Sequence, residues 1–419
     1  MYRMMQNTPK GLRIQIGVFG ARNAGKSSLL NCLAGQNISI VSDVPGTTTD
    51  PVEKAMEFPP AGPVLFIDTA GLDDVGTLGE MRAEKSRKIL ERTDLALIVS
   101  GTGSWGSLEE NLAEQFQAFH TPFIAVFNKS ETVPADPETF RNLEQKKIPC
   151  VQVSALNGDG IGELKAKIIS SVPEDFFAVD GMLPEFITKK SLSVLVTPVD
   201  LEAPKGRLIL PQVQAIRDVL DRESWCAVTK EDLLEECLHS FVRPPDLVVT
   251  DSQMFDKVSA IVPESVPMTS FSILLARQKA DLAVCAAGAA VIDSLQEGSR
   301  ILIAEACTHH PVGEDIGTVK IPRLLRKKTG KTLQIEHCNG HDFPKDLKEF
   351  SLVIHCGGCM FNRREILSRM AFCRGAGVPF TNYGVAIASC MGILERALKP
   401  FPGAYEAYMK AREKAQVQQ

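Results

Sequence analysis

Residues 20–27 read GARNAGKS, which matches the phosphate-binding pattern GxxxxGK(S/T) at every fixed position. The stretch follows an apolar run, Ile14–Phe19, and precedes a helical one, which is the strand–loop–helix context that this pattern requires. Its glycines let the backbone wrap a phosphate, amide N–H groups point inward, and the helix N-terminus adds positive potential. The residues expected to bind a nucleotide here are Gly20, Asn23, Ala24, Gly25, Lys26, Ser27 and Ser28.

The chain from about Leu12 to Val172 alternates apolar runs typical of strands with helical stretches. After Ile14–Phe19, the runs are Val64–Ile67, Leu95–Val99, Phe123–Phe127 and Cys150–Val153. This alternation is typical of βαβ units and predicts a mainly parallel sheet. In such a sheet the carboxyl ends of the strands share one edge, where ligands bind.

Two motifs after the P-loop resemble the switch elements of a GTPase. PGTTTD at 45–50 resembles the switch I loop, whose threonine, here Thr48, closes on Mg²⁺ when the γ-phosphate is present. DTAG at 68–71 resembles the DxxG element, in which Asp68 holds Mg²⁺ through water and Gly71 offers its N–H to the γ-phosphate. Lys26 would reach the β- and γ-phosphates and Ser27 would ligate Mg²⁺. The expected catalytic residues are Lys26, Asn23, Thr48 and Gly71.

Two further motifs stand where a GTPase reads guanine. NKSE at 128–131 takes the place of NKxD, with Asn128, Lys129 and Glu131, and Ser154-Ala155 resembles the SA(K/L) element. The order of these motifs predicts a GTPase rather than an ATPase. Glutamate stands at 131 where the pattern has aspartate, and it loses more rotamer entropy when it pairs with the guanine N1 and N2 hydrogens. Guanine specificity is expected to be retained but looser.

GxxNxGKS together with PGTT and DTAG is similar to the group of GTPases that includes the tRNA-modification GTPase and the ribosome-assembly GTPases. In that group the asparagine at the position of Asn23 helps bind potassium, which acts where other systems use an arginine finger. The alternative is that Asn23 is a simple loop residue. Leu72 follows Gly71 in place of the glutamine that orients water in Ras-type proteins, so intrinsic hydrolysis is expected to be slow.

Two clusters of cysteine and histidine lie far from the P-loop, Cys307-Thr308-His309 and His355-Cys356-Gly357-Gly358-Cys359. Each follows an apolar run that predicts a buried strand, Arg300–Ala306 and Phe350–Ile354. If these strands are parallel neighbours, the three cysteines come together at one edge of a sheet. Three thiolates with nearby imidazoles suit an iron–sulfur cluster or zinc rather than magnesium or calcium, and the spacing alone does not separate the first two.

The two clusters follow the pattern C-x-H, a gap of about 45 residues, and then H-C-x-x-C. Together with the GTPase motifs that open the chain, this pattern resembles the HydF family of FeFe-hydrogenase maturation GTPases over the whole length. The resemblance implies that Cys307, Cys356 and Cys359 hold a 4Fe–4S cluster whose fourth iron takes an exchangeable ligand. It also implies that His309 and His355 fill or shape that fourth position. The implied function is to scaffold the diiron precursor of the H-cluster, receive it from radical-SAM maturases, and deliver it to the FeFe-hydrogenase apoprotein.

The chain is expected to be an α/β protein of three domains: a P-loop GTPase domain at 1–173, a small α/β dimerisation domain at 186–262, and an α/β iron–sulfur cluster-binding domain at 263–419. The middle segment is too small for an independent core, so its apolar surface needs a neighbour. Its strands Ser193–Thr197 and Leu247–Thr250 are expected to need an edge partner or a covering element, and a homodimer in which two such sheets join across a two-fold axis would supply it. The alternative is that the segment packs only on its own flanking domains.

Composition narrows the choice of partners. A net charge of −5 and a low aromatic fraction of 6% argue against a nucleic-acid partner. The longest apolar stretch, Leu282–Ile292, is too short to span a bilayer, and the start of the chain lacks a signal peptide. A cytoplasmic protein with reduced thiols and no membrane partner is therefore expected, in spite of its eleven cysteines.

Two other functions remain open at this point. One is a ribosome- or tRNA-maturation GTPase with a structural zinc module, and the other is a standalone iron–sulfur enzyme, although the CxxxCxxC motif of radical-SAM enzymes is missing. Cys373 and Cys390 lack a partner at motif spacing and are expected to be buried small hydrophobes. His337, Cys338 and His341 are expected in a polar loop and in structural roles.

Overall fold

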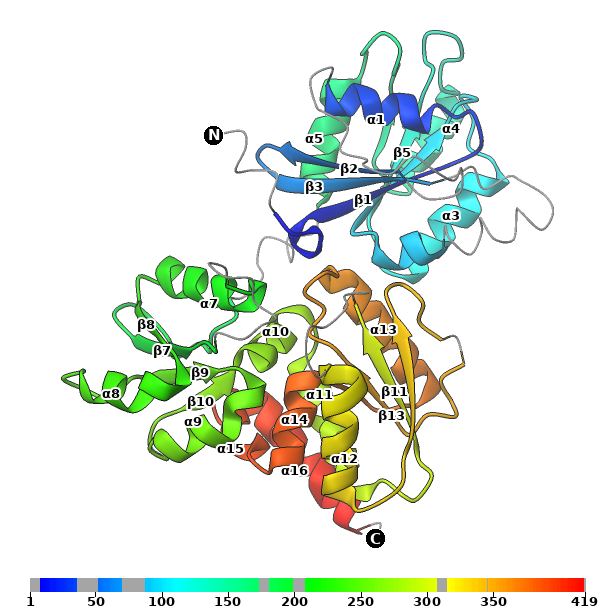
Figure 1. Ribbon diagram of the computed structural model, residues 1–419. Coiled ribbons are helices and arrows are strands. Elements are labelled where there is room, and N and C mark those ends of the chain that lie inside the picture. Colours follow the sequence, from blue (N-terminus) through cyan, green and yellow to red (C-terminus); the bar gives the residue numbers. More distant parts are fainter. Residues whose placement is uncertain are drawn as a thin grey trace. The chain divides into compact units, whose positions relative to one another are not determined.

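The computed structural model describes residues 8–35, 52–69, 87–172, 181–198, 208–306, 315–344 and 346–417. The chain forms two compact units, Met1–Val179 and Asp180–Gln419 (Figure 1). No helix in the described ranges is both long enough and apolar enough to cross a membrane.

The first unit is built on a six-stranded sheet. Its strands, in spatial order, are β2 (Val52–Phe58), β3 (Gly62–Asp68), β1 (Ile14–Phe19), β4 (Leu95–Ser100), β5 (Phe123–Phe127) and β6 (Cys150–Gln152). All neighbours are parallel except β2 and β3, which are antiparallel. The helices are α1 (Lys26–Ala34), α3 (Ser107–Ala118), α4 (Pro137–Gln145) and α5 (Ile161–Ser171). The predicted alternation of strands and helices is confirmed.

Helices cover both faces of this sheet because the side chains of a strand alternate between its faces. On β4, Leu95, Leu97 and Val99 pack in one core with apolar residues of α1 and α5. Ala96 and Ile98 point to the other face and pack in a second core with residues of α3. Strands that are buried on both faces read as continuous apolar runs, which is why the sequence identified them.

The second unit contains two four-stranded sheets, each entirely parallel. The first has the order β10 (Met268–Ser270), β9 (Leu247–Thr250), β7 (Leu192–Val196), β8 (Trp225–Thr229), and the second has the order β12 (Gln334–Asn339), β11 (Arg300–Glu305), β13 (Leu352–His355), β14 (Phe380–Asn382). The helices are α7 (Leu210–Asp221), α8 (Leu234–His239), α9 (Phe255–Ile261), α10 (Phe271–Lys279), α11 (Leu282–Ala289), α12 (Ile321–Thr329), α13 (Arg363–Ala376), α14 (Tyr383–Met391), α15 (Leu394–Leu398) and α16 (Pro402–Val417).

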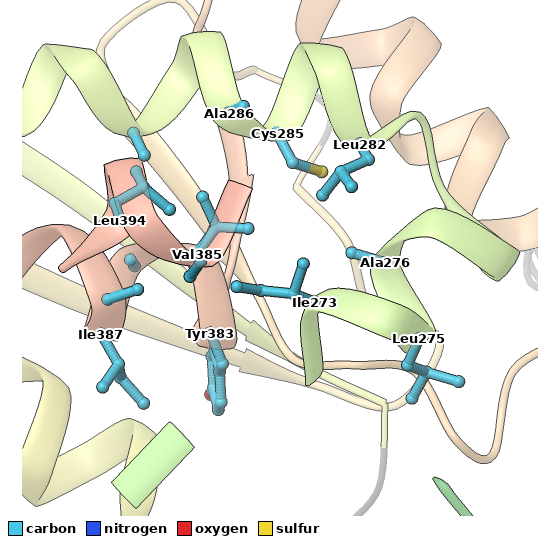
Figure 2. Packing of buried hydrophobic residues seen from close by; sticks show 14 of the residues in the cluster. Ile273, Leu275, Ala276, Leu282, Cys285, Ala286, Tyr383, Val385, Ile387 and Leu394 are labelled. Atoms are coloured by element: carbon cyan, nitrogen blue, oxygen red, sulfur yellow. The ribbon is translucent and has the colours of Figure 1, made fainter. Parts of the chain in front are cut away.

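One hydrophobic core joins the two sheets of this unit. Figure 2 shows part of it, where Ile273 and Ala276 of α10, Cys285 of α11 and Val385 of α14 lie close together. Burying a side chain such as Ile273 or Val385 contributes roughly 1.5–3 kcal/mol. The middle segment therefore obtains from its neighbour the core that it is too short to form alone.

The structure corrects the expectation about unpartnered strands. β7 and β9, which we expected at an edge, are the two interior strands of their sheet, and the edges are β8 and β10. β8 was missed, because it is only five residues long and none of its residues is buried. β10 follows the boundary expected at 262/263, yet pairs with β9 in the second domain's sheet.

Two smaller expectations in the third domain also change. The apolar run predicts one helix over Leu282–Leu295, whereas the structure has α11, which ends at Ala289 and continues as a 3-10 turn, Ala290–Ser294. His337 and Cys338 were expected in a polar loop and instead lie in β12, the exposed edge strand beside β11. Cys373 is fully buried and Cys390 is half-buried.

Candidate functional site

The P-loop connects β1 to α1 and requires two of its glycines. Gly20 has φ +143°, and an added Cβ would lie 2.2 Å from the Val99 carbonyl oxygen. Gly25 has φ +86°, and its Cβ would lie 2.3 Å from Nδ2 of Asn128. Lys26 is buried, and its ammonium group donates to the carbonyl oxygens of Gly20 at 2.9 Å and Ala21 at 2.7 Å. The lysine charge therefore lies inside the loop, where a bound phosphate would meet it.

The residues expected at the magnesium site contact each other. Ser27 Oγ donates to Asp68 Oδ2 at 2.6 Å, across the gap between α1 and the end of β3. Burial raises the pKa of Asp68, while the Ser27 hydroxyl and the Lys26 charge oppose that shift. Asp68 Oδ1 is buried and has no hydrogen-bond partner within the described ranges. An unpaired buried carboxylate oxygen beside a serine hydroxyl fits a hard cation such as Mg²⁺. Thr48 and Gly71 lie outside the described residues.

The expected guanine-reading residues meet the P-loop at the same sheet edge. Asn128 is buried, donates through Nδ2 to the Ala24 carbonyl at 3.0 Å, and accepts at Oδ1 from the Ala155 N–H at 3.1 Å. It thereby connects the P-loop to the loop after β6. Glu131 is exposed, and a hydrogen bond from the Ser154 side chain lowers the pKa of its carboxyl. Lys129 has a positive φ of 65°.

Glu131→Asp is expected to raise the preference for GTP over ATP by about threefold, because aspartate loses less side-chain entropy in the bound state. The measurement is the dissociation constant for ATP divided by the dissociation constant for GTP, at fixed Mg²⁺. Glu131→Gln is the matched control, since it keeps the length of the side chain but loses the charge, and it should lower that ratio. An Asp variant with an unchanged ratio would show that the longer arm has no cost here.

The second site lies where β11 and β13 end. The two strands are parallel neighbours, with Ala304 opposite His355, as the sequence predicted. The Cys356 sulfur accepts the N–H of Ala306 at 3.1 Å and the N–H of Gly358 at 3.4 Å. Ala306, the last described residue before Cys307 in the sequence, therefore contacts the second cysteine cluster. Cys307 and His309 themselves lie outside the described residues. Cys359 and Cys356 are half-buried.

Lys279 lies against this loop and was not anticipated. Its ammonium group donates to the carbonyl oxygens of Phe361 at 2.6 Å, Gly358 at 2.9 Å and Cys359 at 3.4 Å. Burial lowers the pKa of Lys279 to about 8, and the charges of Cys359 and Cys356 act in the opposite direction. No signal in the sequence connects a lysine at the end of α10 with a loop about 80 residues later.

His355 was expected to ligate or shape the fourth iron position, and the structure favours shaping. Its Nδ1–H donates to the Cys356 carbonyl at 2.7 Å, and its Nε2 accepts from Nη1 of Arg369 at 3.0 Å. Burial, and then the Arg369 charge, lower the pKa of His355 to about 3. Both ring nitrogens are thus engaged, and no lone pair remains for a metal in this arrangement.

Arg369 organises a buried polar network that sequence reasoning missed. It donates to the Gly340 carbonyl at 2.6 Å and to Glu365 at 3.2 Å, one turn earlier on α13. Its guanidinium lies over the Phe361 ring at 4.5 Å. His341 donates to the same Glu365 oxygen at 2.8 Å and stacks on Phe361. The structural role expected for His341 fits this geometry.

The described donors fit a thiolate-bound group. Backbone N–H bonds to a sulfur and a neighbouring ammonium favour the thiolate form, which is the form that binds metal. Among the described residues no group of three or more His, Cys, Asp or Glu is placed to hold a metal, and the expected third cysteine lies outside them. A closed Cys₃His zinc site could not use His355 as it stands, because both of its nitrogens are engaged.

Family comparisons identify the second unit. The model of the hydrogen maturase F dimerization domain matches residues 182–280, and that of the hydrogen maturase F tetramerization domain matches residues 283–400. Together they cover more than half of the chain. The chain belongs to the hydrogen maturase F family. A third model, that of a 50S ribosome-binding GTPase, matches residues 15–129, so the first unit is a GTPase domain. The two models that match the second unit are both named for oligomerization domains of the family.

Individual relatives that match part of the chain are GTPases by name. GTPase Der of Wolinella succinogenes is 35% identical over 208 residues, which is 47% of this chain and 43% of that protein. The tRNA modification GTPase MnmE of Chromobacterium violaceum is 37% identical over 162 residues, 38% of this chain and 35% of that protein. The chain spans less than half the length of these relatives. The solved structure of Aquifex aeolicus Era is 22% identical, with a TM-score of 0.33, and the match covers 52% of this chain and 92% of that one.

Proposed function

We propose that this member of the hydrogen maturase F family is a GTP-hydrolysing scaffold that binds an iron–sulfur cluster and carries the diiron precursor of the H-cluster to the FeFe-hydrogenase apoprotein. The observation that supports it is the Cys356 sulfur, which accepts two backbone N–H groups at the shared edge of β11 and β13. Such bonds stabilise a thiolate and tune a bound iron–sulfur group. Radical-SAM maturases are the proposed donors of the diiron precursor.

The proposed cluster ligands are Cys307, Cys356 and Cys359. Three cysteines leave one iron of a 4Fe–4S cluster open, which a carrier needs because its cargo must dock there and leave again. Because His355 is bonded to Arg369, we propose that His309 or the cargo itself binds the open position of the fourth iron. His355 would then act by holding the Cys356 carbonyl, and so the backbone of the ligand loop.

A transfer assay tests the carrier proposal. The anaerobically reconstituted full chain, loaded with a synthetic diiron complex and mixed with the FeFe-hydrogenase apoprotein, is expected to produce hydrogen evolution. The matched control is the same chain reconstituted without the diiron complex, which should leave the hydrogenase inactive. Equal activity from both samples, or from neither, would contradict delivery by this chain.

The proposed nucleotide chemistry is hydrolysis of GTP to GDP and phosphate with Mg²⁺. Lys26 and Ser27 would bind the phosphates and the metal, and Asp68 would hold the metal through water. Mg²⁺ offsets the negative charge that builds up on the phosphates. The proposal has three further residues. Asn23 would bind potassium, Thr48 of switch I would bind Mg²⁺, and Gly71 would donate its N–H to the γ-phosphate.

A homodimer through the free edge of β8 is the proposed assembly. β8 is an edge strand, and no strand in the described ranges pairs with its outer side. It carries Trp225, whose exposed fraction is 64%, and Val228, which is 46% exposed. An apolar strand edge that faces water is unfavourable, and pairing two copies of β8 across a two-fold axis would remove both edges.

Trp225→Arg is expected to convert the dimer to a monomer, because two guanidinium groups would face each other across the two-fold axis. Losing one large aromatic contact per chain corresponds to about 2 kcal/mol or more. Light scattering on the purified protein measures the change. Leu156→Arg, at another exposed apolar position in the first unit, is the matched control and should stay dimeric. A Trp225→Arg protein that remains a dimer would place the interface elsewhere.

A further inference from the structure

Lys279 is a buried cation whose contacts all lie in one short loop. Its side chain is at the last position of α10, and the residue is 4% exposed. An ammonium group has three N–H donors and no acceptor, and the three oxygens around it belong to residues 358, 359 and 361. A methionine or leucine would fill this space without the desolvation of a charge, so a lysine here requires a reason beyond packing.

We propose that Lys279 is a positioning residue of the metal site, which fixes the shape of the loop from Cys356 to Phe361 and places a positive charge beside the two cysteine sulfurs. The inference rests on the proposed function, because such a charge matters most when the sulfurs carry a metal group. Gly358 shows how the loop is held: its N–H bonds the Cys356 sulfur, and its carbonyl bonds Lys279. The lysine thus holds the carbonyl of a residue whose own N–H contacts a ligand atom.

The charge has a direct electrostatic consequence. An iron–sulfur cluster with cysteine thiolates becomes more negative when it is reduced, so a nearby cation stabilises the reduced form more than the oxidised form. Removing the cation therefore lowers the reduction potential. A residue that only supported the fold would change the occupancy of the cluster or the stability of the protein but would leave the potential of the bound cluster where it was.

Arg277 provides a matched control on the same helix. It is also largely buried, and it also donates to backbone carbonyls, those of Gly181 and of Leu183, the latter at 3.0 Å. Its side chain pairs with Glu185 and makes none of these bonds to the ligand loop. Replacing Arg277 removes a buried cation from α10 without removing one from the metal site.

The experiment compares the full-length wild-type chain with Lys279→Arg, Lys279→Gln, Lys279→Met and Arg277→Gln. Each is reconstituted anaerobically with iron and sulfide, assayed for both, and titrated to its midpoint potential by EPR. Gln keeps N–H donors without the charge, Arg keeps the charge, and Met loses both. We expect Lys279→Gln to hold the cluster with a potential about 59 mV lower, a tenfold change in a one-electron equilibrium. Lys279→Arg and Arg277→Gln should keep the wild-type potential.

The outcomes separate the two proposals. If the wild-type chain takes up no cluster, the proposed function fails and this inference with it. If the wild-type cluster forms and Lys279→Gln has the same potential, the role of Lys279 alone is overturned. If Lys279→Met does not fold, the Gln and Arg variants still decide, since they differ in charge while both can bond the loop carbonyls. An equal fall of the potential in Arg277→Gln would also overturn the role of Lys279, because the loss of a cation away from the ligand loop would then have the same effect.

Discussion

Replacing Cys356 or Cys359 with alanine is expected to abolish the iron–sulfur cluster, with a loss of nearly all bound iron and of the EPR signal of the reduced protein. Each substitution leaves at most two of the three proposed thiolates, and two thiolates hold a four-iron cluster poorly. Cys307→Ala should have the same effect. Iron and acid-labile sulfide per chain, measured after anaerobic reconstitution, give the result.

The control for this prediction is Cys338→Ala. Cys338 is also a half-buried cysteine at this end of the unit, but it lies on β12, and burial raises its pKa to about 11, which disfavours the thiolate. This variant should keep the wild-type iron content. If Cys338→Ala lost the cluster and Cys359→Ala kept it, the ligand assignment would be wrong.

Lys26→Ala is expected to reduce GTP hydrolysis by about 100-fold or more, since it removes a preorganised charge from the phosphates. The iron content should be unchanged, because the lysine belongs to the first unit and the proposed metal ligands to the second. Phosphate release at saturating Mg²⁺ measures the rate. Lys146→Ala, an exposed lysine at the end of α4, should hydrolyse GTP at the wild-type rate.

The same assay tests the role proposed for Asn23. Wild-type hydrolysis should run faster in potassium than in sodium at equal ionic strength, because potassium would stabilise charge where other GTPases use an arginine. Asn23→Ala should abolish that difference. Equal wild-type rates in the two salts would leave Asn23 as a loop residue.

The parts of the fold that the sequence predicted have a common physical cause. β4, β5 and β13 are buried on both faces, so the body of each appears as an apolar run that differs from the pattern of a surface helix. Because these strands are parallel, the residue that follows each one reaches the same sheet edge. This is why the sequence alone places Asn128 at the sheet edge of the P-loop, and Cys356 at the end of β11.

The parts that could not be predicted depend on tertiary contacts. β8 is a half-exposed edge strand of five residues, and a run that short does not distinguish a strand from a loop. Arg369 and Lys279 are charged residues on helices, where the usual expectation is exposure, and only the packed structure shows them bonding His355 and the ligand loop. The pairing of His355 with Arg369 likewise changed an expected ligand candidate into a residue with both nitrogens engaged.

The most direct test of the central claim is to measure metal and acid-labile sulfide per chain. The full chain is purified for this without exposure to oxygen and without reconstitution. The account predicts about four irons and about four sulfides per chain, in a brown protein whose reduced form gives a cubane EPR signal. A colourless protein with one tightly bound zinc and no sulfide would contradict it, because the cysteines would then form a closed structural site with no position for a cargo.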